Sequence, residues 1–251
     1  MTFKDHFSGH AAHYASSRPI YSDEIFDFVA SLPQKRSLAL DCATGNGQAA
    51  AGLAERFERV IAIDASAEQL SHAAPLPRVE FRQAPAEQTG IPSGTVDLVT
   101  AAAGVHWFDF DRFYPEVERV LAPGGALAVW SYDLMRVSPE IDRLVRWLAR
   151  ESPLAACWPP ERRWVDEEYR TLPFPFEEVP VPPLVIEARW PLDRVLGYIG
   201  TWSSNARYRR ETGRDSVELI RRDLEAAWGD PAAERLVRWP IMMRAGYPPQ
   251  R

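Results

Sequence analysis

Short aliphatic and β-branched runs alternate with stretches of helical spacing between about residue 37 and residue 131. The runs are mostly apolar along their whole length, as strands buried on both faces of a sheet are. They cover residues 38–41, 60–64, 79–82, 96–101 and 126–131. The stretches 48–57, 67–73 and 111–121 predict helices, and Pro123, Gly124 and Gly125 then force a turn. This alternation predicts a parallel sheet with crossover helices.

The second half of the chain does not continue this alternation of strands and helices. Ser138 and Pro139 predict the start of one more amphipathic helix, because proline suits the first helical position. Eight prolines between residues 153 and 183 argue against regular helix and indicate an irregular insertion. Beyond it, the pattern predicts a strand over 184–190, helices over 192–202 and 216–228, and a last strand over 235–244. Pro240 interrupts that last strand and indicates an edge position or a bulge.

Composition excludes several classes of protein. The chain has 251 residues, of which 46% are hydrophobic and 25% charged, and its net charge is −6. These values are typical of a soluble globular protein and exclude a disordered chain, a collagen and a basic nucleic-acid-binding tail. No run approaches the roughly 18 apolar residues of a membrane span, and the first residues form no signal-peptide core, so we expect a cytoplasmic protein. Cys42 and Cys157 are too few for a disulfide framework.

A loop of small residues ends the first predicted strand. Its sequence is Asp-Cys-Ala-Thr-Gly-Asn-Gly at positions 41–47, and it leads directly into an alanine-rich helix. A strand, a small-residue turn and a helix N-terminus form a nucleotide-binding corner, in which glycine lets the ligand approach the backbone. The second strand ends at Asp64, seventeen positions beyond Gly47, where a carboxylate can accept both hydroxyls of a ribose. Together the two features predict a ligand that contains a nucleoside.

The spacing of the small residues narrows the choice of ligand. A dinucleotide fingerprint has glycines in the order G-x-G-x-x-G, whereas Gln48 here occupies the position of the last glycine. No Gly-Lys-Ser/Thr sequence follows the loop, which excludes a P-loop. The Asp41 carboxylate at the mouth of the loop would repel a pyrophosphate and attract a cation. A ligand with an adenosine and a positive charge therefore fits better than NAD.

On these residues the chain resembles the class I S-adenosylmethionine-dependent methyltransferases. The loop at 41–47, the acid at position 64, Ala86 with Glu87, and the Ala-Pro-Gly-Gly sequence at 122–125 look like motifs of that family, although Ala43 stands where glycine is commoner. Within the family, the chain is most similar to a group of small-molecule enzymes that includes trans-aconitate methyltransferase. That finer resemblance rests on Phe7, Tyr14, Arg18-Pro19 and His106-Trp107-Phe108-Asp109.

The resemblance implies an α/β, Rossmann-like fold with a mostly parallel seven-stranded sheet and helices on both faces. It implies a single domain in which residues 1–36 form an N-terminal lid and residues 37–131 form the cofactor-binding core. Residues 132–183 would form a helical and proline-rich cap. Residues 184–251 would supply the C-terminal strands and helices, and with them the acceptor pocket.

The resemblance also implies a set of cofactor-binding residues. They are Tyr14, Arg18, Asp41, Ala43, Thr44, Gly45, Gly47, Asp64, Ala65, Ala86, Glu87, Ala102, Ala103, His106 and Trp107. Asp41 and the following loop would hold the methionine portion of S-adenosylmethionine, Asp64 the ribose, and Glu87 the adenine. Ala102 would lie under the sulfonium and His106 beside the methyl group. Tyr14 and Arg18 would belong to the lid.

The acceptor pocket is expected in the C-terminal half, where tryptophan and tyrosine are frequent enough for an enclosed pocket. We expect Trp202, Arg207 and Tyr208 to bind the acceptor, because a guanidinium can hold an acidic group by two hydrogen bonds. Methyl transfer from a sulfonium is an in-line displacement that depends on alignment and on the exclusion of water. A carboxylate acceptor needs no base. A hydroxyl or an amine would use one, and His106 is the candidate.

These inferences predict an S-adenosylmethionine-dependent enzyme that methylates a small organic acid at oxygen. The alternatives are a nicotinamide-dependent oxidoreductase on the same fold and a non-catalytic S-adenosylmethionine-binding protein. The net charge of −6 disfavours nucleic acid as a partner, and no membrane partner is expected. Both a monomer and a homodimer remain open. His6, His10 and His13 have helical spacing but no further ligand motif, so no metal site is expected.

Overall fold

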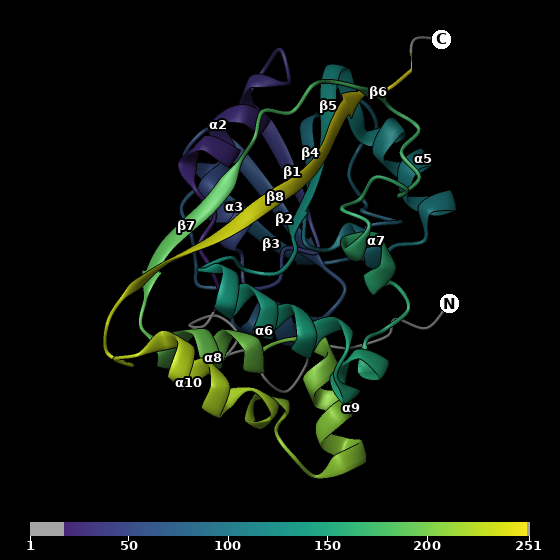
Figure 1. The fold of residues 1–251 in the computed structure, drawn as a ribbon. Helices are drawn as coiled ribbons and strands as arrows, with labels where there is room; N and C mark the ends of the chain where they lie inside the picture. Colours follow the sequence, from purple (N-terminus) through teal and green to yellow (C-terminus); the bar gives the residue numbers. More distant parts are fainter. Residues whose placement is uncertain (1–17, 250–251) are drawn as a thin grey trace.

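Five parallel strands form the centre of the molecule. The computed structural model describes residues 18–249. The parallel strands are β1 (Leu38–Cys42), β2 (Arg59–Asp64), β3 (Val79–Gln83), β4 (Val96–Ala102) and β5 (Leu121–Tyr132). They lie in the order β3-β2-β1-β4-β5 (Figure 1). The nearly continuous burial of β1, β2 and β4 explains their apolar sequences, because helices cover both faces.

Three antiparallel strands extend this sheet. The long strand β8 (Arg235–Tyr247) pairs with β5, and its other edge carries β6 (Glu177–Glu178) and β7 (Val185–Trp190). The main path of the sheet is therefore β3-β2-β1-β4-β5-β8-β6, with β7 paired to the first half of β8. The predicted mostly parallel sheet with seven strands along its path is confirmed.

Pro240 lies inside β8, but β8 is paired along both of its edges. On one side Pro240 is opposite Val185 of β7. On the other side it falls between the last β5 pair, Tyr132 with Ile241, and the isolated bridge of Arg136 with Arg238. Proline has no N–H to donate, and here it occupies the gap in the β5 ladder. The sequence-based alternatives of an edge strand or a bulge did not include this arrangement.

Helices cover the two faces of the parallel sheet with separate hydrophobic clusters. On one face lie α2 (Asp23–Ser31) and α3 (Gln48–Ala54), whose buried side chains pack with those of β1, β2 and β5. On the other face lies α5 (Phe110–Val120), which buries Phe113, Val117 and Val120 against Leu40 and Ile61. The shorter α4 (Ala67–Ser71) and the 3₁₀ turn η1 (Val105–Trp107) follow β2 and β4.

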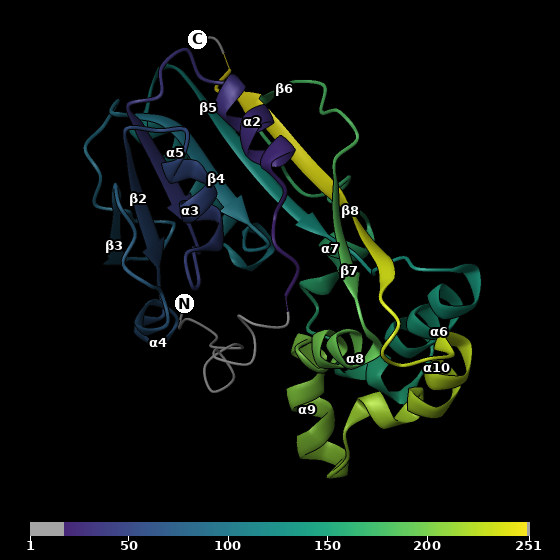
Figure 2. The ribbon, with the colours of Figure 1, turned by 90° about the vertical axis from the view of Figure 1, so that its left-hand side faces the viewer.

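A group of helices forms a cap beyond one end of the sheet. It comes from two separate parts of the chain, as Figure 2 shows. The first part contains α6 (Pro139–Arg150), η2 (Pro153–Cys157) and α7 (Arg162–Asp166). The second contains α8 (Leu192–Gly200), α9 (Ser203–Thr212), η3 (Ser216–Leu219) and α10 (Arg221–Trp228). Contacts of η2 with α9 and of α6 with α10 join the two parts.

Most of the C-terminal aromatic side chains form the hydrophobic core of this cap. Trp190 lies 4.7 Å from Trp239 between ring centroids, and Tyr198 lies 5.5 Å from Trp239 and 6.2 Å from Trp202. Trp190, Trp228 and Trp239 are fully buried. Large aromatic rings contribute strongly to such cores. The aromatic content of this half therefore reflects packing as well as any pocket. In the described part of the chain, no helix has the length and apolar character needed to cross a membrane.

Gly52 sets the distance between α2 and α3. A Cβ at this position would collide with the ring of Phe26. We predict that Gly52→Ala lowers the free energy of unfolding, although alanine is favoured over glycine by about 1 kcal/mol within an unobstructed helix. Gly200→Ala is the matched control, because its added Cβ would meet no atom within 4 Å apart from those of its chain neighbours and its own helix backbone. Urea unfolding would contradict this account if the two variants had the same stability.

Candidate cofactor and acceptor site

A large cavity opens where the carboxyl ends of β1, β2 and β4 meet. Its volume is about 1580 Å³. Ligands of open α/β sheets bind in this crevice. Thirteen of the predicted cofactor-binding residues line it: Arg18, Asp41, Ala43, Thr44, Gly45, Asp64, Ala65, Ala86, Glu87, Ala102, Ala103, His106 and Trp107. Tyr14 lies outside the described residues, and Gly47 is absent from the lining.

The loop after β1 turns sharply through three residues with positive φ. Ala43, Gly45 and Gly47 have φ of 53°, 58° and 87°. Gly47 precedes α3, and a Cβ there would lie 2.8 Å from the ring of Phe81. Gly47 is therefore needed to start the helix, whereas Gly45 lines the cavity. Ala43 adopts a left-handed conformation, which is unfavourable for L-residues that carry a side chain.

Asp64 connects the end of β2 to this loop. One carboxylate oxygen accepts a hydrogen bond from Gly45 N at 2.9 Å, and the other accepts one from Ser66 N, also at 2.9 Å. The side chain lines the cavity but is largely buried. Backbone N–H donors hold a carboxylate in a defined orientation. Asp64 is therefore fixed where β2 and the loop face the same ligand.

Asp41 is a buried carboxylate at the floor of the cavity. It accepts hydrogen bonds from the hydroxyls of Thr44 at 2.6 Å and Thr100 at 2.7 Å. Burial raises the pKa of Asp41 to about 6; the two hydroxyls lower it, and the negative charge of Asp64 raises it. Ionisation of Asp41 is therefore less favourable in the protein than in water. A cation bound in the cavity would stabilise that form.

The loops after β1 and β4 approach each other closely. A Cβ on Gly104 would lie 2.7 Å from the Cβ of Ala43. Ala103, which precedes Gly104, also has a positive φ of 54°. Small residues are needed on both loops, because a larger side chain on either would collide with the other loop and push the two apart.

His106 follows β4 and lines the cavity with a largely buried imidazole. Its Nδ1 lies 2.8 Å from the hydroxyl oxygen of Tyr169. Burial, together with the positive charge of Arg162, lowers the pKa of His106 to about 3. The ring is therefore neutral at physiological pH and has little tendency to take up a proton. Tyr169 was not identified from the sequence, because it lies in the irregular segment after α7 and belongs to no motif.

A second, smaller cavity adjoins the first where the sheet meets the cap. Its volume is about 70 Å³. Arg18, Ala103, His106, Trp107 and Tyr132 line both cavities. The remaining wall of the small cavity comes from Ser131, Asp133, Leu134, Trp158, Pro159, Arg162, Val165, Tyr198, Trp202 and Ser203. The two cavities therefore meet beside His106.

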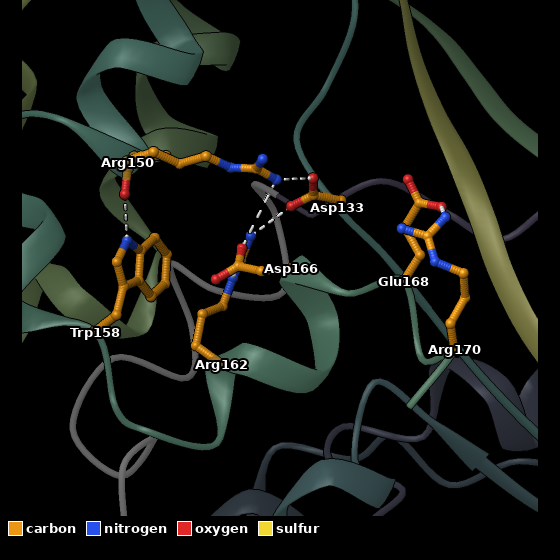
Figure 3. A network of polar contacts seen from close by, with 8 residues as sticks. Asp133, Arg150, Trp158, Arg162, Asp166, Glu168 and Arg170 are labelled. Atoms are coloured by element: carbon orange, nitrogen blue, oxygen red, sulfur yellow. Dashed lines mark hydrogen bonds and ion pairs between the residues drawn. The ribbon is translucent and has the colours of Figure 1, made fainter. Parts of the chain in front are cut away.

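Ion pairs hold the cap against the end of β5 at this junction. Figure 3 shows Asp133 between two guanidinium groups, with Arg162 at 2.5 Å and Arg150 at 2.8 Å. Arg162 also contacts Asp166 at 3.1 Å, and its guanidinium carbon lies 4.5 Å from the centre of the Trp158 ring. Partly buried guanidinium groups that stack on aromatic rings lose little entropy when they bind carboxylates. This network fixes one wall of the small cavity.

The three predicted acceptor-binding residues lie in different surroundings. Trp202 lines the small cavity. Arg207 is exposed on α9, where it pairs with Glu211 at 2.7 Å, and Tyr208 is buried in the core of the cap. Neither Arg207 nor Tyr208 is part of the lining of the two cavities.

The outer part of the large cavity has an aromatic wall that the sequence did not reveal. Phe110, Tyr114, Trp164 and Phe174 contribute to it from α5, α7 and the segment before β6. Phe110 and Tyr114 are stacked with ring centroids 5.8 Å apart. The four residues are distant in sequence, so no local pattern brings them together. Among the described residues, no group of His, Cys, Asp or Glu could hold a metal ion, and His6, His10 and His13 lie outside them.

Comparison with known proteins decides the family. Residues 40–129 match the family described as "Methyltransferase domain". A Dictyostelium discoideum protein whose name describes it as a methyltransferase is 33% identical over 229 residues, which are 90% of this chain and 87% of that protein. The chain belongs to the S-adenosylmethionine-dependent methyltransferases.

Other relatives of this methyltransferase agree with that assignment. A solved structure from Anaeromyxobacter dehalogenans, described as a type II methyltransferase, has 49% identity and a TM-score of 0.86 over 92% of this chain and 99% of that one. The trans-aconitate 2-methyltransferase of an Azoarcus species is 35% identical over 152 residues, 55% of this chain and 58% of that enzyme. The expectation of a methyltransferase is confirmed. The nicotinamide-dependent and non-catalytic alternatives are not supported.

The cofactor of this methyltransferase is S-adenosyl-L-methionine. The cavity fits such a ligand on three observations: an oriented carboxylate at the end of β2, a cradle between Ala43 and Gly104 too narrow for another Cβ, and a buried carboxylate at the floor. The first suits a ribose, the second a flat ligand against the backbone, and the third a positively charged one.

The raised pKa of Asp41 predicts a specific pH dependence of stability. Asp41 binds protons more tightly in the folded protein than in the unfolded chain, so folding is destabilised as pH rises from 3.8 to about 6. The expected loss is on the order of 3 kcal/mol. Asp41→Asn removes the titrating group, while the two threonine hydroxyls can reorient toward the amide.

Urea unfolding at pH 4 and pH 7 measures this effect. We expect Asp41→Asn to gain stability relative to the wild type at pH 7 and to lose that advantage at pH 4. If the wild type and Asp41→Asn differed in stability by the same amount at both pH values, the raised pKa of Asp41 would be contradicted.

Proposed function

We propose that this methyltransferase transfers the methyl group of S-adenosylmethionine to a carboxylate oxygen of a small organic acid. The observation that supports this proposal most strongly is the small cavity beside His106. Its lining includes several aromatic side chains together with Arg18 and Arg162. Such a space suits a compact anion.

The proposal assigns the cofactor to the large cavity. Asp64 would accept the ribose hydroxyls, the backbone after β1 would hold the methionine portion, and Ala86 with Glu87 would border the adenine. The Glu87 carboxylate accepts a hydrogen bond from Asp109 N at 2.9 Å, which fixes it at the start of α5. When bound, the cofactor supplies an electrophilic methyl group on a positively charged sulfur. Asp41 would stabilise that positive charge from below.

Arg18 is well placed to bind a carboxylate. Its guanidinium donates to the Tyr132 hydroxyl at 3.2 Å and to Thr201 O at 3.1 Å, and it lies 5.5 Å from the centre of the Tyr198 ring. These contacts orient it at the boundary of the two cavities. The family resemblance assigns Arg18 to the cofactor, and its position also suits the acceptor. The affinity of an Arg18 variant for the cofactor and its KM for the acid distinguish these two roles.

The properties of the site agree with an acceptor that is already ionised. The His106 ring is neutral at physiological pH and is a weak base, because its pKa lies near 3. A carboxylate needs no base at that pH. The Azoarcus relative acts, by its name, on trans-aconitate, which is a carboxylic acid. That relative supports the acid class without identifying the acceptor.

Turnover of a panel of acids tests the proposal. Purified protein with methyl-labelled S-adenosylmethionine is offered small mono-, di- and tricarboxylic acids, each beside its carboxamide, and a set of small amines and phenols. We expect base-labile methyl esters from one or more acids and no product from the amides. Methylation of amines or phenols and of none of the acids would contradict the acid assignment.

The role of Arg18 is then measured with the best acid. Loss of a hydrogen bond to a charged group is worth about 1.5–3 kcal/mol, so Arg18→Gln should raise KM for the acid by roughly 10- to 100-fold. S-Adenosylhomocysteine should bind the variant as it binds the wild type. A weakened cofactor affinity with an unchanged KM would assign Arg18 to the cofactor instead. Arg209→Gln is the control, because Arg209 is exposed on α9 and pairs with Asp215 outside both cavities.

A further inference from the structure

Tyr169 lies in a segment of strained backbone and contacts the ring of His106. Tyr169 and the preceding Glu168 have φ of 59° and 54°, in the left-handed region that residues with a Cβ rarely adopt. Such strain persists only when the surroundings impose it, and it is frequent at functional sites. Here the backbone N–H of Tyr169 donates to Trp164 O at 2.8 Å, and the whole residue is buried. The strained turn places one polar atom, the phenol hydroxyl, 2.8 Å from His106 Nδ1.

The phenol and the imidazole can each act as donor or acceptor in this contact. A phenol donates more readily than a neutral imidazole N–H, and a neutral imidazole nitrogen accepts better than a phenol oxygen. The favoured direction is therefore from the Tyr169 hydroxyl to Nδ1 of His106. Burial raises the pKa of the Tyr169 phenol further, so the hydroxyl keeps its proton.

We infer that Tyr169 donates to Nδ1 of His106 and so holds the ring as the tautomer with its proton on Nε2. Tyr169 is a positioning residue in this account. A ring whose Nδ1 accepts a hydrogen bond must carry its single proton on the other nitrogen. His106 lines the junction of the two cavities, and there it offers a donor rather than a base.

This inference rests on the proposed function and narrows its chemistry. A donor at the junction suits an oxyanion, so the Nε2–H would bind one oxygen of the acceptor carboxylate while the other attacks. In that step a C–O bond forms to the methyl carbon, the C–S bond breaks, and its electron pair stays on sulfur. The acceptor becomes a neutral methyl ester, and no proton is transferred. Hydroxyl and amine acceptors would lack the base that they require.

The charged groups around His106 agree with a neutral donor. Arg162 reaches the small cavity from α7, and its positive charge disfavours a charged imidazole. Arg18 lines the same cavity from the segment before α2. Asp133 also lines this cavity, but it pairs with Arg150 and Arg162. Tyr132 and Tyr198 are the remaining titratable groups in the wall.

Nitrogen NMR of the histidine side chains tests the inference without any acceptor. In the wild type saturated with S-adenosylhomocysteine, we expect one ring with a proton on Nε2 and a hydrogen-bonded, unprotonated Nδ1 from pH 5 to pH 8. His106→Asn identifies that signal by its loss. A proton on Nδ1, or titration of this ring within the range, would overturn the inference. The tautomer itself is measured in the wild type, and the variant serves only to assign the signal.

Two variants isolate the contribution of Tyr169. Tyr169→Phe removes the donor, and the Nδ1 signal should move toward that of a ring that exchanges between tautomers. Tyr114→Phe is the matched control, because it removes another buried phenol, which donates to Pro173 O rather than to His106. An unchanged His106 signal in Tyr169→Phe would overturn the role of Tyr169.

The same design separates this inference from the proposed function. If no acid is methylated but the tautomer is as expected, the proposed acceptor class fails while the role of Tyr169 stands. If acids are methylated but the proton is on Nδ1, the inference alone fails. With an acid acceptor and saturating cofactor, kcat of Tyr169→Phe should keep the wild-type pH profile, while KM for the acid rises severalfold.

Discussion

The hydrogen bonds between the Asp64 carboxylate and the N–H groups of Gly45 and Ser66 are the contacts on which the site depends. They join the end of β2 to the loop after β1, and so two neighbouring strands present one continuous surface to a ligand. The loop itself contains residues in left-handed conformations, which are unfavourable unless neighbouring contacts hold them. Asp64 therefore has two roles that reinforce each other: it shapes the loop, and it offers a carboxylate beside it.

The second constraint is the length of β8. This strand runs beside β5 in its second half and beside β7 in its first half, so it extends beyond the end of the parallel sheet. The cap helices gather at that extension, and Figure 2 shows them beyond the carboxyl end of β5. The ion pairs of Asp133 with Arg150 and Arg162 then fix the cap to the sheet. The small cavity beside His106 lies at this junction, and the proposed function places the acceptor there.

The sequence predicted the parallel core closely, because strands buried on both faces leave continuous apolar runs and the crossover helices leave a regular spacing. It also predicted thirteen residues that line the large cavity, since the carboxyl ends of parallel strands meet at one edge and the motifs lie at those ends. The sequence did not predict the packing of segments that are distant from one another along the chain. The cap combines residues 139–166 with residues 192–228, and no local pattern shows that two distant segments pack together. Tyr169 and the aromatic wall near Trp164 were missed for the same reason.

We propose that S-adenosylmethionine lies across the ends of β1, β2 and β4 with its sulfur toward the junction of the two cavities. A crystal structure with bound S-adenosylhomocysteine measures this most directly. The account predicts the ribose hydroxyls on the Asp64 carboxylate and the sulfur beside Ala103 and His106. A ribose that does not contact Asp64, or a sulfur that faces the aromatic wall at Phe110 and Trp164, would contradict it.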